Sequence, residues 1–365
     1  MLDNDMIEFL TYRNAMKSNY RKGVHALRCI LNNRKQAETF AGSLGGVSLV
    51  LGVSQPDGNS EALRALLEGS AVIDQATLTW LKNWWPEQCG SWDTLAADQG
   101  RCSTIATDPF LWERVGVSPV GAGKILAGLV GQDSQNFAAM QAVASSATAM
   151  QAVAASPVAI AAIYRSDVAL SAVDSEVSAA ATFYGADSVA MGKAVVILAG
   201  LDPAGYADMS AVAASATAMS AVAASSTAMA AVAASSTAMA AVAASATARS
   251  ALDGSSVARQ ALKASPLATE ISLVSSQGQY WDNPGTKAMK GLILATKAGN
   301  SDNAFSITKI DSTSTGASQN TRNAAKSGST GYLDWYENYP NYAWVMNSIT
   351  YYAYYTTTKI KYIPC

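Results

Sequence analysis

The chain has 365 residues, enough for two or three domains, with 14% charged residues and a net charge of -2. This near-neutral balance gives no electrostatic reason to expect nucleic acid or an anionic membrane as a partner. No apolar stretch reaches transmembrane length, and the start MLDNDMIEFL lacks the positive charge of a secretory signal. We therefore expect synthesis in the cytoplasm and no membrane insertion.

The cysteines and the histidine argue against metal or acid–base chemistry. The four cysteines contain no CxxC pair, and His25 is the only imidazole. The chain also lacks P-loop, dinucleotide, GxSxG and HExxH motifs. We expect no cofactor, no metal and no enzyme activity. Cys89 and Cys102 lie close in a loop-like stretch and could pair in oxidising surroundings; the alternative is two free or semi-buried thiols.

Residues 1–105 are expected to form a mostly helical N-terminal domain. A first helix is predicted from Asp5 to Thr39, followed by a glycine-rich break. The stretches SEALRALLEG and GSAVIDQATLTWLKNWW predict two further helices with Ser60 and Ser70 as N-caps. Three tryptophans near the end of this stretch are core or interface residues, or else an aromatic patch that docks onto a larger body: Trp80, Trp84 and Trp85.

Residues 106–274 are dominated by a ten-residue unit. With serine as position zero, the unit reads S-x-x-A-M-x-A-V-x-x, and SSTAMAAVAA is one copy. Alanine fills position three, and valine or leucine fills position seven. Serine occupies position zero at an unbroken spacing of ten residues, in Ser215, Ser225, Ser235, Ser245, Ser255 and Ser265. An upstream block keeps the unit one residue out of phase, through Asn136, Ser146, Ser156 and Ser166.

Short helices separated by breaks fit this period best. In one continuous helix, an apolar stripe of period ten would wind rapidly around the axis, and Ala and Met disfavour a β-solenoid. Ser or Asp followed by Pro is typical of an N-cap and first helical position. Four such pairs mark the breaks: Asp108–Pro109, Ser118–Pro119, Ser156–Pro157 and Ser265–Pro266.

Each short helix must be stabilised by packing against neighbours. Positions three, four and seven share one face, and the small alanine at position six would let neighbouring backbones approach closely. The units could stack within one chain, or the arrays of several chains could pack together. Because residues 209–248 carry almost no charge, an exposed surface of Ala, Val and Met favours packing between chains.

Residues 275–365 are expected to form a compact β-rich domain, since short Thr/Ile/Phe runs alternate with turn signals. Its many tyrosines and tryptophans are core and interface residues, or exposed rings that bind sugar by stacking. The best receptor-binding candidates combine rings with polar groups: Asp334, Trp335, Tyr336, Glu337, Asn338, Tyr339, Asn341, Tyr342 and Trp344. Asp334 and Glu337 could be imagined as a glycosidase pair, but nothing around them indicates a cleft.

The decads such as SSTAMAAVAA, with the closing segments GTKAMKGLILATKAG and KIKYIPC, resemble the tail or head fibres of tailed bacteriophages. The resemblance covers residues 108–365. It implies an intertwined homotrimer in the virion, attached to other virion proteins through residues 1–105. It also implies adhesion to a host-surface glycan or protein through the C-terminal domain. Two alternatives stay open: a collar, whisker or decoration fibre without a receptor, and a bacterial surface adhesin.

Overall fold

The computed structural model describes Val47 and residues 72–273, 285–297, 305–310, 333–334, 344–353 and 358–365. The predicted helix from Asp5 to Thr39 and the predicted cap Ser60 lie outside these residues. The chain forms two compact units, Met1–Phe183 and Tyr184–Cys365. Their boundary lies inside the predicted repeat region.

The first unit is helical in its described part. α6 begins at Ile73 with Val72 as N-cap, so the predicted N-cap at Ser70 is wrong. Its helices are α6 (Ile73–Leu81), α7 (Trp92–Ala96), α8 (Gln99–Thr107), α9 (Pro109–Val115), α10 (Pro119–Leu129), η1 (Ser134–Asn136), α11 (Met140–Ala144), α12 (Ala147–Ala154), α13 (Pro157–Tyr164), α14 (Asp167–Asp174) and α15 (Val177–Tyr184), whose last residue belongs to the second unit.

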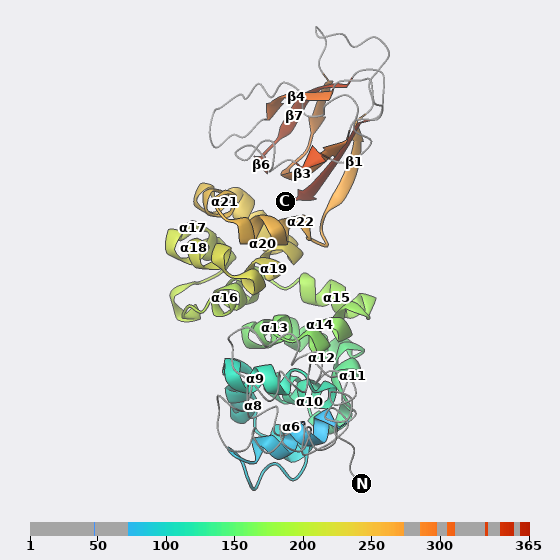
Figure 1. The fold of residues 1–365 in the computed structure, drawn as a ribbon, viewed down its shortest axis with the longest axis vertical. Helices are drawn as coiled ribbons and strands as arrows, with labels where there is room; N and C mark the ends of the chain where they lie inside the picture. Colours follow the sequence, from blue (N-terminus) through green and yellow to red (C-terminus); the bar gives the residue numbers. More distant parts are fainter. Residues whose placement is uncertain are drawn as a thin grey trace, which may run out of the picture. The chain divides into compact units, whose positions relative to one another are not determined.

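The second unit continues with helices and ends in strands (Figure 1). Its helices are α16 (Ser188–Leu198), η2 (Pro203–Gly205), α17 (Met209–Ala214), α18 (Ala216–Ala224), α19 (Ser226–Ala234), α20 (Ser236–Ala244), α21 (Ala246–Asp253) and α22 (Ser256–Lys263). Its strands are β1 (Thr269–Leu273), β2 (Gly285–Ala288), β3 (Gly291–Lys297), β4 (Phe305–Ile310), β5 (Leu333–Asp334), β6 (Trp344–Val345), β7 (Ser348–Ala353) and β8 (Thr358–Pro364).

Each ten-residue unit from α18 to α22 forms one short helix, as the sequence predicts. The serine at position zero is the N-cap, and its hydroxyl accepts a hydrogen bond from the backbone N–H three residues later. The backbone turns sharply at each serine: α18 and α19 meet at 102°. The Asp108–Pro109, Ser118–Pro119 and Ser156–Pro157 steps likewise begin α9, α10 and α13.

The predicted helix after Ser265–Pro266 is wrong. Only a turn follows Ser265, and β1 begins at Thr269. Strand structure therefore starts a few residues before the predicted boundary at 274/275.

In the second unit, the short helices stack within one chain. α16 packs against α19, α17 against α20, α18 against α21, and α19 against α22. Because each helix contacts the third helix after it, three units complete one turn of a solenoid. This stacking buries the apolar face without a second chain, so the premise that Val and Met would be exposed is wrong.

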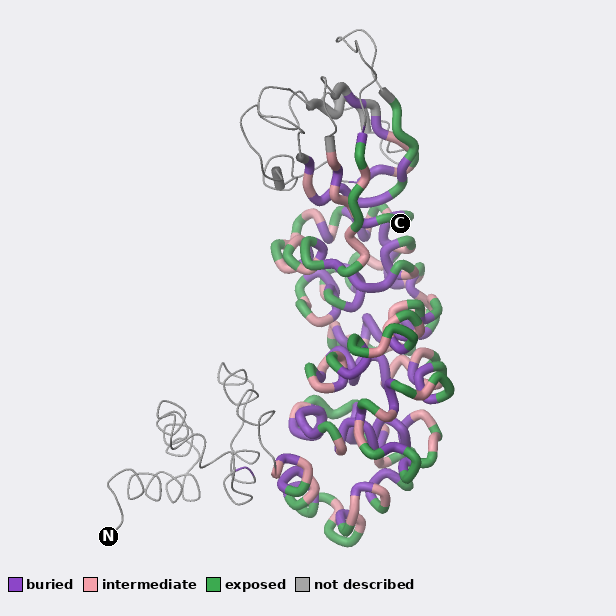
Figure 2. Tube along the Cα trace, turned by 90° about the vertical axis from the view of Figure 1, so that its right-hand side faces the viewer, coloured by how far each residue is buried: buried purple, intermediate pink, exposed green. Residues whose placement is uncertain are grey.

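Four positions of the unit are buried inside this solenoid in α18, α19 and α20, whereas α22 buries only Ala258 and Leu262. Figure 2 colours the buried residues purple. In α18 these are Ala218, Met219, Val222 and Ala223, at positions three, four, seven and eight. The inward prediction for positions three, four and seven is confirmed. Small buried residues stand at position eight, and position six is half-buried in α18 (Ala221) but fully buried in α19 (Ala231). The outward positions hold mainly Ala, Ser and Thr.

The two longest helices, α10 and α16, occupy equivalent places in the sequence. Gly123 of α10 and Gly192 of α16 are 69 positions apart (192 − 123). The same spacing separates the glycines that end the two helices, Gly131 (φ 73°) and Gly200 (φ 77°). Each helix is followed by a short 3-10 helix capped by an aspartate, and then by the series of short helices. The chain thus contains two tandem copies of a 69-residue module.

The strands form two antiparallel sheets. One has the order β1-β8-β3-β5, with β6 also paired to β3, and the other has the order β2-β7-β4. β1, which directly follows the helices, pairs with β8 along its whole length, from Thr269 opposite Tyr362 to Leu273 opposite Thr358. The predicted strand character of the C-terminal region is confirmed for these segments.

Candidate functional site

The serine at position zero makes a second bond that the sequence analysis missed. The hydroxyls of Ser245, Ser255 and Ser265 donate to the carbonyls of Ala213, Ala223 and Ala233 at 2.6, 2.5 and 2.5 Å. Each donor and acceptor are 32 residues apart, so the bond joins consecutive turns of the solenoid. We call this row of bonds the serine ladder. The hydroxyl at position zero therefore makes two bonds: it caps the backbone that follows it, as the N-cap in α21 and α22, and it donates the ladder bond to the preceding turn.

Replacement of Ser255 by Ala should destabilise the chain by about 1–3 kcal/mol. The change removes the N-cap of α22 and leaves the Ala223 carbonyl without its ladder donor. Urea unfolding followed by circular dichroism measures the loss. Ser256→Ala, at an exposed neighbouring position, is the matched control and should change stability by less than about 0.5 kcal/mol. Equal effects of the two changes would contradict the role of the ladder.

The last solenoid helix before α22 carries a polar cluster where the sheet meets the array. The Nε1 of Trp344 in β6 donates to Oδ1 of Asp253 in α21 at 3.2 Å. Nη1 of Arg249 donates to the Ala243 carbonyl and lies 4.0 Å from Sδ of Met346. Burial raises the pKa of Asp253 to about 6, against the opposing effects of the Trp344 hydrogen bond and the charges of Arg249 and Arg259.

This raised pKa predicts that stability falls as the pH rises from 4 through 6. The folded chain holds the Asp253 proton more tightly than the unfolded chain, whose carboxyl has the ordinary value of 3.8. The contribution is full below about pH 4 and lost above about pH 6, and we expect about 1–2 kcal/mol after discounting for partial exposure. Urea unfolding across this range measures it. Asp253→Asn should flatten the slope, whereas Glu87→Gln, at an exposed position, should not.

Most of the candidate receptor-binding residues lie outside the described part of the chain. Trp335, Tyr336, Glu337, Asn338, Tyr339, Asn341 and Tyr342 belong to that group. The backbone of Asp334 lies in β5, opposite Ala295 of β3. Trp344 is 6% exposed, so its ring packs inside the second unit rather than presenting a face to a ligand. The side chains of Asp334 and Glu337, considered above as a glycosidase pair, lie outside the described part of the chain.

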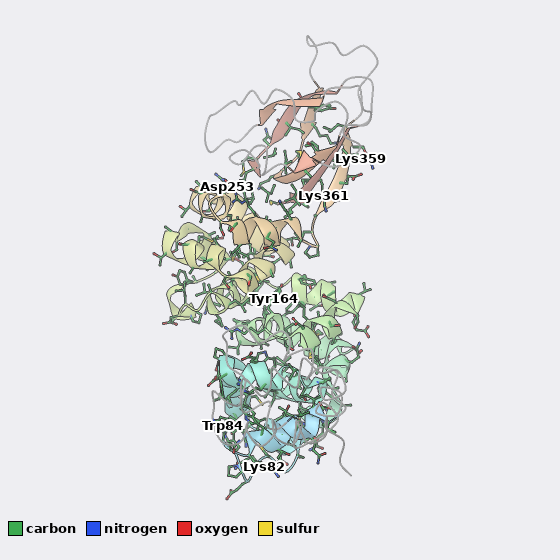
Figure 3. All side chains as sticks on the ribbon, in the orientation of Figure 1. Lys82, Trp84, Tyr164, Asp253, Lys359 and Lys361 are labelled. Carbon is green, nitrogen blue, oxygen red and sulfur yellow. The ribbon has the colours of Figure 1, made fainter. Side chains whose placement is uncertain are left out.

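The first unit carries an exposed aromatic patch, formed by Trp80, Trp84 and Phe110 around Arg114. Trp84 and Phe110 are 43% and 44% exposed, whereas Trp80 is buried. Figure 3 labels Trp84 in the first unit. The guanidinium of Arg114 lies 3.7 Å from the centre of the Phe110 ring, and burial lowers its pKa. Trp80 is therefore a core residue, whereas Trp84 is exposed, and its docking onto a larger body stays a prediction.

An ion pair between the buried Lys124 and the partly exposed Asp93 connects α10 to α7. Nζ of Lys124 donates to Asp93 Oδ1 at 2.6 Å and to the Ser134 carbonyl at 2.9 Å. Burial alone would raise the pKa of Asp93, but the hydrogen bonds from Lys124 and Ser134 lower it below its usual value. Because every polar group of this cluster has a partner, its role is structural.

The possible disulfide between Cys89 and Cys102 is not formed; both are free, buried thiols. Sγ of Cys102 donates to the Ala96 carbonyl at 3.5 Å. Burial raises the pKa of Cys102 to about 12 and also raises that of Cys89. Thiols of raised pKa form little of the thiolate that makes disulfides. The free-thiol alternative therefore holds.

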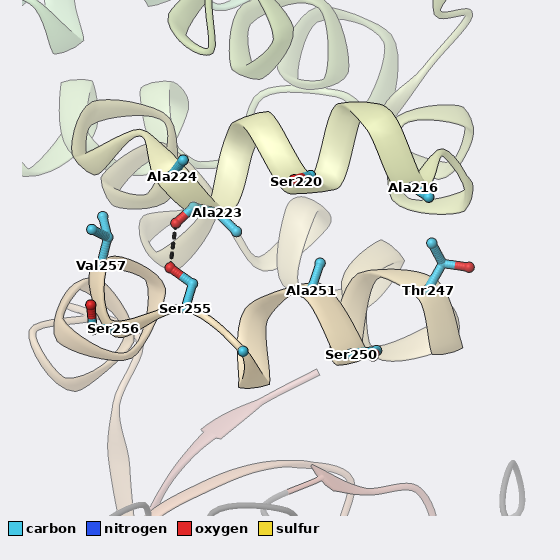
Figure 4. Close-up of a pocket in the computed structure, with 11 residues that line it drawn as sticks. Ala216, Ser220, Ala223, Ala224, Thr247, Ser250, Ala251, Ser255, Ser256 and Val257 are labelled. Atoms are coloured by element: carbon cyan, nitrogen blue, oxygen red, sulfur yellow. Dashed lines mark hydrogen bonds between the residues drawn. The ribbon is translucent and has the colours of Figure 1, made fainter.

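A shallow groove of 730 Å³ runs between α18 and α21 (Figure 4). Ser220 and Thr247 line it together with alanines, a glycine, a valine and further serines, and the ladder bond of Ser255 closes one end. Its lining offers hydroxyl and methyl groups but no titratable side chain. Within the described ranges, no three His, Cys, Asp or Glu residues lie close enough to hold a metal ion.

No protein-family model matches the chain. No curated protein is similar to it. In the described part of the chain, none of the helices is long and apolar enough to cross a membrane alone, and three sharply bent helix pairs meet that test only in combination.

Proposed function

We propose that this chain is a structural fibre protein of a tailed-phage virion. Its helical array acts as a spacer, and its C-terminal β-rich region adheres to a host-surface glycan or protein. The observation that carries the proposal is the array of nearly identical capped helices, each stacked on the third helix after it. Such an arrangement gains length with each added unit and needs no cleft, which suits a spacer.

The attachment end is proposed to lie in residues 1–105. The exposed patch of Trp84 and Phe110 supports docking onto a larger body, because aromatic rings contribute much contact area in protein interfaces. The homotrimer rests on the resemblance to phage fibres. The array buries its own apolar face, so subunits would join through other surfaces.

Adhesion is tested with the full chain, because β1 and Trp344 tie the sheet to the helices. The labelled chain is applied to bacterial cells and to immobilised lipopolysaccharide and cell-wall polysaccharides. Trp335→Ala and Tyr339→Ala should weaken binding about tenfold or more, as loss of a stacking ring does. Trp84→Ala, in the first unit, is the control. If the full chain binds no surface and never blocks infection, the receptor role is wrong.

A collar, whisker or decoration fibre without a receptor is the second candidate. The burial of Trp344 favours it, since one candidate ring already serves packing. Release of reducing ends from host polysaccharide would instead indicate an enzyme. Light scattering at micromolar concentration tests the oligomer: a trimer has three times the 37.8 kDa of one chain, and a monomer would contradict the trimer.

A further inference from the structure

The helix α21 departs from the repeat at two inward positions. Position four holds Met219, Met229 and Met239 in the three preceding helices, but Arg249 in α21. Position eight holds Ala223, Ala233 and Ala243 in those helices, but Asp253 in α21. The other inward residues, Ala248 and Leu252, follow the repeat and are fully buried. The two changes therefore place a pair of opposite charges at positions that hold uncharged residues in α18, α19 and α20.

Arg249 ends the serine ladder. The next acceptor after Ala233 is the carbonyl of Ala243, whose ladder donor would be residue 275, ten after Ser265. Strand β1 occupies Thr269–Leu273, where the helix leading to that donor would lie. Instead, Nη1 of Arg249 donates to the Ala243 carbonyl. The guanidinium thus supplies, within the array, the bond that the next turn would have supplied.

Asp253 joins the array to the sheet. Its carboxylate accepts the hydrogen bond of the Trp344 indole. Trp344 itself is paired with Leu292 of β3, and β3 pairs with β8, which pairs with β1. The hydrogen bond at Asp253 therefore contacts β6, and β6 is connected through β3 and β8 to β1.

Both residues would be costly inside the array. Position four is fully buried in the preceding helices, where Met219, Met229 and Met239 are 0% exposed. A charged group buried without partners costs several kcal/mol. In the last turn of the array, Arg249 donates to the Ala243 carbonyl and Asp253 accepts from an indole N–H of the sheet.

We propose that Arg249 and Asp253 form a terminal latch that ends the helical array and holds β6 against α21. The charged groups that act on Asp253 are Arg249 of its own helix and Arg259 of α22, and β6 contributes the neutral indole of Trp344. Opening the latch would release the sheet from the last turn while leaving the preceding helices stacked.

The test restores the repeat at both positions, with Arg249→Met and Asp253→Ala together. Hydroxyl-radical footprinting with mass spectrometry measures side-chain exposure residue by residue. Labelling of Trp344 should rise about tenfold, because a hydrogen bond to a charged group is lost and the open form becomes more populated. Trp112, which is fully buried, and Trp84, which is exposed, are internal references and should not change. Unchanged protection of Trp344 would overturn the latch.

A second pair of variants decides the case if the double change unfolds the array, which labelling of Met229, fully buried in α19, would reveal. Asp253→Asn keeps an oxygen that can accept from the indole, so Trp344 should stay within about twofold of its original protection. Asp253→Leu has similar size but no acceptor, and labelling of Trp344 should rise about tenfold. Equal protection of Trp344 in these two variants would contradict the proposal that this hydrogen bond holds β6 against α21.

Discussion

Removal of the ten residues 226–235 is expected to damage the protein less than removal of the three residues 230–232. The ten-residue deletion takes out one whole unit, and α20, which has the same sequence as α19, moves into its place. The helices α18, α20, α21 and α22 keep their serine caps, and each keeps a partner three units away. The expected loss is about 1–2 kcal/mol, the contribution of one unit in a repeat protein.

The three-residue deletion keeps all units but shortens one. α19 would lose about 4.5 Å of length and the buried side chain of Val232, so its contacts with α16 and α22 fall out of register. We expect a loss of about 4 kcal/mol or more, as for a large core truncation. Urea unfolding with far-ultraviolet circular dichroism compares the two. Equal midpoints would contradict stacking by whole units.

Alanine at Gly192 or Gly123 is expected to destabilise the chain by about 3 kcal/mol or more. A Cβ at Gly192 would lie 2.3 Å from the Met209 backbone nitrogen, and a Cβ at Gly123 would lie 2.4 Å from that of Met140. Backbone cannot yield as a flexible side chain can. This collision must outweigh the gain of about 1 kcal/mol that alanine brings to a helix interior.

The matched control is Gly205→Ala, because a Cβ there meets no atom within 4 Å. It should leave stability within about 0.5 kcal/mol of the original. Thermal unfolding measures all three variants. Since Gly123 and Gly192 are equivalent in the two modules, both should be intolerant; tolerance at either one would contradict the equivalence.

The two modules explain a limit of the sequence analysis. The ten-residue period is conspicuous because its units are nearly identical, whereas the 69-residue period appears only in scattered residues. Gly-Lys at 123–124 recurs at 192–193, and a Gly-x-Asp follows at Gly131 and again a Gly-Leu-Asp at Gly200. Aligning these pairs would have revealed the module. The role of each glycine still required the backbone, because close approach leaves no trace in composition.

Local chemistry let the sequence by itself determine the short helices. A serine hydroxyl caps the helix that follows it, a proline begins one, and the spacing of Ala, Met and Val places them on one face; each depends on residues within a single turn. The alternating C-terminal segments likewise became strands. The failure after Ser265–Pro266 has a tertiary reason: the chain leaves the solenoid there, because residues from Thr269 pair with β8 as strand β1.

Only the tertiary structure decided what covers the inward face. The angle at each serine, 102° between α18 and α19, returns the chain to the same side after three units, so one chain buries its own methionines and valines. That angle and the 32-residue ladder bonds join residues far apart in sequence, beyond the reach of a periodicity argument. Arg249, Asp253 and Trp344 come together for the same reason: three positions across two elements acquire a common role only when the chain has folded.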